Sequence, residues 1–152
     1  VFGDCPIIDP NIVDQIVNYF VDNPGYDFVG NDLKTSYPPG MEVEVFGLEA
    51  LKDSSQRLPN LHRDREHGTL FIRQNPDIYR IMNLEASDAH RRPELSLEVD
   101  TLEDLKVISA IITHFGGRLD YSLSEIIDFM EANSELAAIN KNVPRRWKQY
   151  RD

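Results

Sequence analysis

The chain has 152 residues, enough for one domain with a sizeable core, and its 41% hydrophobic and 28% charged residues are typical of a globular protein. Its formal net charge of −10 argues against a nucleic-acid or anionic-membrane surface, but not against a nucleotide held by a metal ion and a few local donors. No apolar run approaches the roughly 20 residues that span a bilayer. The single Cys5 excludes an internal disulfide and favours a reducing compartment, so we expect a cytoplasmic protein.

Local signals in the first half of the chain predict helices and strands in alternation. Asp9 is a good N-cap, Pro10 suits the first helical position, and apolar residues then recur at helical spacing as far as Val21. A short strand is predicted over 27–30. The stretch MEVEVFG, which begins at Met41, alternates between apolar and acidic residues and predicts a strand with one core face and one acidic face. Two short helices are expected next, in LEALKDSSQRL and REHGTLFIRQN.

The second half has clearer helix starts. DIYRIMNLEA and the alternating ELSLEVD predict strands. Thr101 and Asp104 have the spacing of a capping box, and Ser122 and Glu125 repeat it, so a helix is expected after each pair. The first of these helices is expected to end at Gly116 and to bury one apolar side, made of Leu102, Leu105, Ile108, Ile112 and Phe115. SELAAIN predicts a last short helix.

Strands that alternate with helices indicate the α/β class. Only three whole strands are convincing, beside the short piece at 27–30 and a Val1–Phe2 stub that resembles the end of a strand. Such a sheet is thin for so many helices. We therefore expect this chain to be the C-terminal part of a larger α/β fold.

Two aspartates stand in parallel contexts. Asp4 and Asp100 are each predicted to follow an apolar strand and to precede a turn into a helix. Sites in open α/β sheets form beyond the carboxyl ends of strands, where two carboxylates can hold Mg²⁺ together with phosphate oxygens and water. Aspartate is also a common turn and capping residue at such junctions, so the pattern alone leaves both interpretations open.

The segment HRDREH, from His62 to His67, contains fragments of two known motifs. A kinase-type HRD loop requires an asparagine where Thr69 stands, and a zinc pair requires histidines four residues apart rather than five. Both are rejected. Arg65, Glu66 and His67 then open a helix, a position that suits anion or sugar contacts or simply a charged surface turn.

Three further features allow more than one interpretation each. Cys5 is either a nucleophile beside Asp4 or a small buried thiol. The acidic face formed by Glu42 and Glu44 contacts either sugar hydroxyls or water. The basic tail PRRWKQYRD, which contains Arg145, is either a solvated end, an arm that packs on an acidic neighbour or, less commonly for such a tail, a specific phosphate site.

Five stretches in this order resemble the cytidylyltransferase family: GDCPIIDP, PPGMEVEVFGLEAL, REHGTLFI, LEVDTLEDL and SELAAIN. Each motif is weak alone, but five in register are specific, and the resemblance extends from Val1 to about Lys141. The nearest branch takes part in spore coat polysaccharide biosynthesis and is related to the acylneuraminate and 3-deoxy-manno-octulosonate cytidylyltransferases.

The resemblance implies a Rossmann-like nucleotide-diphospho-sugar transferase fold, with a mixed sheet and flanking helices. It implies a Mg²⁺-dependent enzyme that joins a sugar acid to CMP, takes CTP and releases pyrophosphate. By this resemblance Asp4 and Asp100 match the two metal-holding, catalytic carboxylates. The segments that line the sugar side correspond to Glu42, Glu44, Arg65, Glu66 and His67.

The resemblance also implies a homodimer, with the helices after Ser122 as the expected contact. We expect residues 1–121 to form the C-terminal part of the nucleotidyltransferase domain, and residues 122–152 a helical extension with a basic tail. The Gly-rich loop that cradles CTP phosphates in this family has no counterpart in the sequence. The chain taken alone is therefore expected to be inactive, with a non-catalytic sugar-binding or dimerisation fragment, or a glycosyltransferase of the same fold, as the alternatives.

Overall fold

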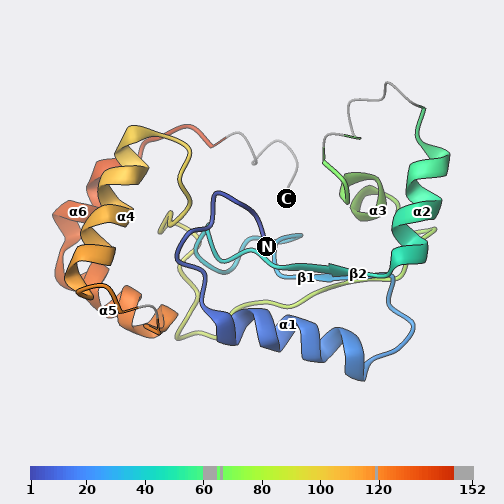
Figure 1. Ribbon diagram of the computed structural model, residues 1–152, viewed down its shortest axis with the longest axis horizontal. Helices are drawn as coiled ribbons and strands as arrows, with labels where there is room; N and C mark the ends of the chain where they lie inside the picture. Colours follow the sequence, from blue (N-terminus) through green and yellow to red (C-terminus); the bar gives the residue numbers. More distant parts are fainter. Residues whose placement is uncertain (60–64, 66, 119, 146–152) are drawn as a thin grey trace.

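The computed structural model describes residues 1–59, 65, 67–118 and 120–145. Helices and strands follow one another along this part of the chain (Figure 1). Their bounds are α1 Pro10–Asp22, β1 Phe28–Gly30, β2 Glu44–Phe46, α2 Leu48–Arg57, α3 Leu70–Gln74, β3 Ile81–Asn83, α4 Leu102–His114, α5 Leu123–Ala132 and α6 Ser134–Asn140. Helix α1 runs along the sheet, helices α4, α5 and α6 gather at one end, and α2 and α3 lie at the other (Figure 1).

The sheet is small and mixed, in the order β2-β1-β3. Strand β1 pairs antiparallel with β2, with Val29 opposite Val45, and parallel with β3, with Val29 opposite Met82. The expected strands at 27–30, in MEVEVFG and in DIYRIMNLEA are therefore confirmed, each as a shorter strand. The mixed α/β class with flanking helices is confirmed with them.

Neither of the apolar segments before Asp4 and Asp100 forms a strand. The expected strand in ELSLEVD is wrong, because that segment makes single hydrogen bonds to two different neighbours instead of a ladder. Leu97 N–H donates to the carbonyl of Pro39 at 2.6 Å, and Val99 N–H donates to the carbonyl of Asp4 at 2.9 Å. The Val1–Phe2 stub is exposed and has no strand geometry.

Helix ends follow the capping signals. Asp9 accepts from the N–H of Asn11 at 2.8 Å at the start of α1. Both capping boxes are complete, at Thr101 for α4 and at Ser122 for α5. Gly116 has φ +62°, the left-handed conformation expected just beyond the end of a helix.

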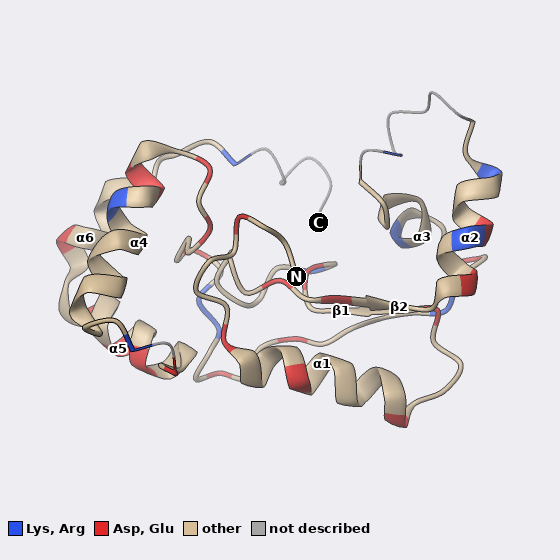
Figure 2. Ribbon diagram, in the orientation of Figure 1, with Lys and Arg blue, Asp and Glu red and all other residues tan. Residues whose placement is uncertain are grey.

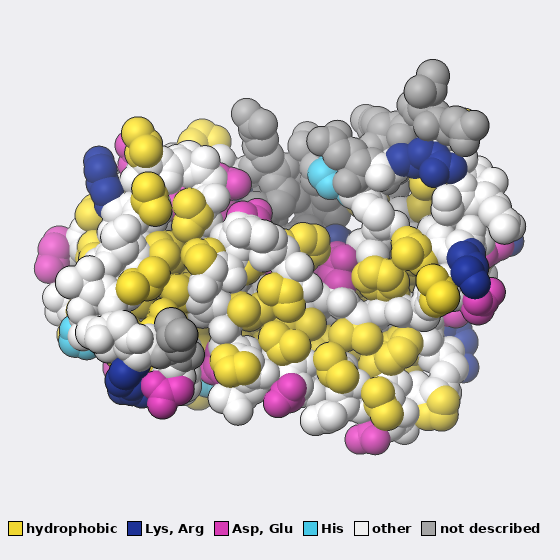
Figure 3. All heavy atoms as spheres, viewed as in Figure 1, with side chains coloured by type: hydrophobic (Ala, Val, Ile, Leu, Met, Phe, Trp, Pro, Cys, Tyr) yellow, Lys and Arg dark blue, Asp and Glu magenta, His cyan; other side chains and the backbone are white. Residues whose placement is uncertain are grey.

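The face that α4 buries agrees with the expected one only in part, because Ile108 is buried and Phe115 packs against the core as expected. Leu102, Leu105 and Ile112 are exposed, and the buried side of α4 consists of Asp104, Val107, Ile108 and Ile111. That side packs against α6 and into the main core, whose fully buried members include Ile16, Val29, Met41, Leu97, Ile111, Leu123 and Ile126. Hydrophobic side chains remain on the surface over α4, and also over α1 (Figure 3). No helix in the described residues is both long and apolar enough to cross a membrane.

Candidate functional site

The hydrogen bond between Asp4 and Val99 joins two segments that are far apart in the sequence. Because Val99 N–H donates to the Asp4 carbonyl at 2.9 Å, Asp100 follows directly on a residue bound to Asp4. Both aspartates are exposed. The structure thus brings the segments of the two expected metal carboxylates together, at a place where their side chains face solvent.

The backbone at Asp100 is held by the buried carboxylate of Asp104. Oδ2 of Asp104 accepts from the N–H of Asp100 at 3.1 Å and from the N–H and hydroxyl of Thr101, each at 2.9 Å. Asp104 itself is 0% exposed. The capping box at the start of α4 therefore also fixes the turn that carries Asp100.

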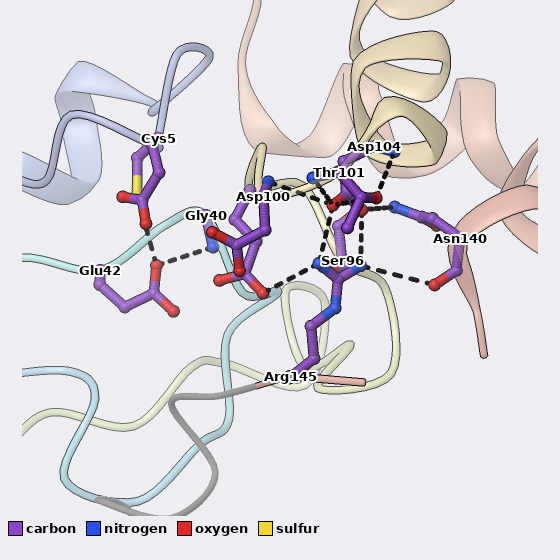
Figure 4. Close-up of polar contacts among 11 residues, drawn as sticks. Cys5, Gly40, Glu42, Ser96, Asp100, Thr101, Asp104, Asn140 and Arg145 are labelled. Carbon is purple, nitrogen blue, oxygen red and sulfur yellow. Dashed lines mark hydrogen bonds and ion pairs between the residues drawn. The ribbon is translucent and has the colours of Figure 1, made fainter. Parts of the chain in front are cut away.

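Arg145 approaches the same carboxylate from the C-terminal side (Figure 4). Its Nη2 lies 2.6 Å from Oδ1 of Asp104 and its Nη1 lies 3.0 Å from Oδ2, a bidentate pair, while Nη1 also lies 3.3 Å from Glu98. Asn140 donates to Oδ1 at 2.8 Å. Burial opposes ionisation of Asp104, but hydrogen bonds from Arg145, Asn140 and Thr101 outweigh it and hold the pKa of Asp104 well below its usual range.

Glu42 contacts Cys5, the residue after Asp4, and it is buried rather than presented on an open acidic face. Its Oε2 accepts from the N–H of Gly40 at 2.7 Å and from the Cys5 thiol at 3.6 Å (Figure 4). Cys5 Sγ also lies 3.6 Å from Asp4. Burial first, and then the charges of Glu42 and Asp4, raise the pKa of the Cys5 thiol far above its ordinary value. A thiol held protonated in this way fits the buried-thiol interpretation of Cys5 and not the nucleophile.

Glu44 belongs to a separate polar cluster between β2 and α3. Its carboxylate accepts from Thr69 at 2.6 Å and from Nη1 of Arg73 at 2.9 Å, and the same Nη1 lies 3.1 Å from Asp32. The side chains of Glu44, Arg73 and Asp32 are 6%, 11% and 0% exposed. The expectation of one acidic face shared by Glu42 and Glu44 is wrong, because each carboxylate forms hydrogen bonds with a different set of buried partners.

The segment expected to open a helix at Arg65 lies beside the end of α2. Arg65 is exposed, and its guanidinium donates to the carbonyls of Ser55, Leu58 and Pro59, where it satisfies groups that the helix end leaves unpaired. His67 is exposed, and its carbonyl accepts from the N–H of Leu70 at 2.8 Å. Glu66 lies outside the described residues. Helix α3 begins only at Leu70, after this segment.

The donor set at Asp4 and Asp100 fits a divalent cation that prefers oxygen ligands. Two exposed carboxylates on adjoining segments match the one or two protein carboxylates that Mg²⁺ takes beside phosphate oxygens and water. Acidic residues outnumber basic ones, 26 against 16, and they are spread widely over the ribbon (Figure 2). Within the described ranges, no group of three or more histidine, cysteine, aspartate or glutamate side chains is arranged to hold a metal ion.

Two features of the site were not predicted from the sequence. The buried pair of Asp104 with Arg145 joins residues 41 apart in sequence, and the Arg73 pairs link α3 to β2 and to the loop after β1. The only signal for the first was the basic tail, for which packing on an acidic neighbour was one of the interpretations. Arg145 confirms that interpretation for its own position.

Comparison with known proteins agrees with the motif-based resemblance. No protein-family model matches the chain. Spore coat polysaccharide biosynthesis protein SpsF of Bacillus subtilis is 34% identical over 136 residues, which are 89% of this chain and 55% of that protein. The structure of a cytidylyltransferase from Leptospira borgpetersenii superposes with a TM-score of 0.83 at 25% identity, over 94% of this chain and 58% of that one. The resemblance to the cytidylyltransferase family is confirmed.

A further relative carries no assigned activity. An uncharacterized protein of Methanocaldococcus jannaschii is 30% identical over 150 residues, which are 99% of this chain and 58% of that protein. The chain therefore spans a little over half the length of the curated relatives it matches.

Proposed function

We propose that the protein is a Mg²⁺-dependent cytidylyltransferase that activates a sugar acid as its CMP derivative for synthesis of a surface or spore coat polysaccharide. The resemblance to cytidylyltransferases and to a spore coat polysaccharide protein supports this proposal. The observation that carries it is the 2.9 Å hydrogen bond from Val99 to Asp4, which brings the two exposed aspartates onto adjoining segments. Because the chain spans little more than half of its relatives, the activity is proposed for the whole protein.

In the proposed reaction an oxygen of the sugar acid, its anomeric hydroxyl, forms a bond to the α-phosphorus of CTP. The bond from that phosphorus to the bridging oxygen breaks, pyrophosphate leaves, and the hydroxyl proton passes to solvent. Asp4 and Asp100 would hold Mg²⁺, which when bound neutralises charge on the phosphate oxygens. Asp104 keeps the backbone of Asp100 in place through the 3.1 Å hydrogen bond.

Fewer residues are exposed on the sugar side of the proposed site than the sequence suggested. Glu42 is buried against Gly40 and Cys5, so it supports the Asp4 turn from within. Glu44 is committed to Arg73 and Thr69. Of the expected sugar-side residues that the structure describes, Arg65 and His67 are the exposed ones, and we propose that both contact the sugar acid, Arg65 while its guanidinium stays bound to carbonyls at the end of α2.

The direct test is pyrophosphate release from CTP and a panel of sugar acids by the intact protein. Asp4→Asn and Asp100→Asn are each expected to lower turnover by about 100-fold or more, because the loss of a carboxylate weakens both metal binding and phosphate charge neutralisation. Asp128→Asn changes an exposed aspartate of α5 and is expected to keep wild-type turnover. Wild-type turnover in Asp4→Asn would refute the metal assignment. No pyrophosphate release with any sugar acid would refute the proposed activity.

A further inference from the structure

The guanidinium of Arg145 is buried among acidic side chains next to the turn that carries Asp100. The side chains of Arg145, Glu98 and Asp104 are 5%, 5% and 0% exposed. Charges removed from water to this degree remain stable only with close, directional partners. The bidentate contact with Asp104, at 2.6 and 3.0 Å, supplies them and fixes the rotation of that carboxylate.

One oxygen atom connects this ion pair to Asp100. Oδ2 of Asp104 accepts from Nη1 of Arg145, and the same atom accepts from the N–H of Asp100 and from Thr101. The other oxygen, Oδ1, accepts from Asn140 and from Nη2 of Arg145 (Figure 4). Loss of Arg145 would leave Asp104 buried with excess negative charge, and the carboxylate would then rotate or take up water. Each of these changes alters the acceptor that holds the Asp100 N–H.

On its other side, the Asp100 turn is held by the backbone of Asp4. Val99 N–H donates to the Asp4 carbonyl at 2.9 Å, so the residue before Asp100 is fixed as well. The peptide of Asp100 therefore lies between two hydrogen bonds, one to the Asp4 carbonyl and one to Asp104. Only the second of these depends on Arg145.

We infer that Arg145 is a positioning residue, which acts through Asp104 to hold the turn that carries Asp100, so that the carboxylates of Asp100 and Asp4 can share a divalent cation. This inference rests on the proposed function. Arg145, which follows α6, would thus affect the site at the start of α4 without itself contacting substrate or metal. Partners that orient metal ligands in this way commonly contribute 10–100-fold in metal affinity.

Mn²⁺ binding provides a readout that is independent of turnover. Mn²⁺ shares the preference of Mg²⁺ for oxygen ligands, and its free concentration can be followed by electron paramagnetic resonance without nucleotide. Arg145→Met is expected to weaken Mn²⁺ binding by about tenfold or more. Arg145→Lys keeps the buried charge but loses the two-pronged contact, so an intermediate affinity is expected.

A matched control separates positioning from general loss of stability. Arg73→Met removes another guanidinium paired with two buried carboxylates, Asp32 and Glu44, away from the Asp100 turn. It is expected to lower stability to a similar extent and to leave Mn²⁺ affinity unchanged. In an Asp100→Asn background, Arg145→Met is expected to add no further loss of affinity, because its effect passes through Asp100.

The outcomes distinguish this inference from the proposed function. Wild-type Mn²⁺ affinity in whichever Arg145 variants fold, or an equal loss in Arg73→Met, would overturn the positioning role. Retained Mn²⁺ binding that depends on Asp100 and Arg145, with no pyrophosphate release from CTP, would leave the positioning role standing and overturn the proposed activity.

Discussion

Oδ2 of Asp9 accepts a hydrogen bond of 2.7 Å from the backbone N–H of Leu123, 114 residues further along the chain. Oδ1 of the same carboxylate accepts from the N–H of Asn11 and caps α1. One buried side chain, 3% exposed, thus binds the first turns of both α1 and α5. The helices after Ser122 are thereby joined to the start of the fold.

Asp9 variants can separate these two contacts. Asp9→Ala should lower the free energy of unfolding by roughly 2–4 kcal/mol, from the lost cap and from a buried N–H left unpaired. Asp9→Asn keeps one oxygen for α1 but replaces the other by a donor, so an intermediate loss is expected. Urea denaturation measures both. Equal stability of Asp9→Asn and wild type would contradict the role assigned to the contact with Leu123.

Acid sensitivity should trace in part to Asp104. Burial opposes its ionisation, but hydrogen bonds from Arg145, Asn140 and Thr101 lower its pKa in the folded protein below the ordinary 3.8. When the pKa of a carboxyl group is lower in the folded protein than in the unfolded chain, its contribution to stability is complete above the unfolded pKa. That contribution is lost as pH falls from the unfolded pKa through the folded pKa.

We therefore expect the free energy of unfolding to fall more steeply in wild type than in Asp104→Asn between about pH 5 and about pH 2, as followed by urea denaturation. Asp128→Asn, an exposed site, should keep the wild-type slope. The same slope in Asp104→Asn and wild type would show that other carboxylates account for the acid sensitivity.

The Cys5 thiol should be unreactive in the folded protein. Burial and the neighbouring charges of Glu42 and Asp4 raise its pKa, so almost no thiolate forms at neutral pH. A thiol-reactive chromogenic disulfide should modify the folded protein many times more slowly than the unfolded chain. The unfolded chain provides the control, because it contains the same single cysteine. Equal rates in both states would mean that Cys5 is accessible.

Gly40 should tolerate no side chain. Its φ is +107°, and an added Cβ would overlap the carbonyl carbon of Leu97 and lie 2.7 Å from the N of Glu98. Gly40→Ala is expected to lower stability by about 3 kcal/mol or more, through strain and displacement of the 96–98 segment. Gly47→Ala, where nothing lies within 4 Å of the added Cβ, should change it by under about 1 kcal/mol. Thermal unfolding of the two variants, compared with wild type, tests this contrast.

Local signals in the sequence predicted the helix starts well. Asp9, Thr101 and Ser122 each cap the helix expected of them, because a cap depends on residues within one turn. The parallel contexts of Asp4 and Asp100 left a shared site open, and their segments do meet, although through one backbone hydrogen bond and not at the ends of two strands as the pattern assumed. Their Mg²⁺ role stays a prediction.

Contacts between distant residues could not be predicted in the same way. The sequence predicted Asp104 only as part of a capping box, yet it is also fully buried because Arg145 and Asn140 neutralise and bind it. That burial turns α4 so that Leu102 and Leu105, expected on the buried side, are exposed, whereas Ile108 is buried as expected. The alternation in ELSLEVD correctly places Leu97 in the core, but Glu98 is buried as well, beside Arg145. Spacing along the chain carries no information about such a pairing.

The position of Arg145 determines where the protein can be shortened. A truncated version that ends before this residue would lack the counter-charge for Asp104 and Glu98, two carboxylates that lie in the interior. Such a truncation would disturb the turn before α4, although it deletes no residue of that turn. Designs that trim or replace the C-terminus should therefore retain the chain through Arg145.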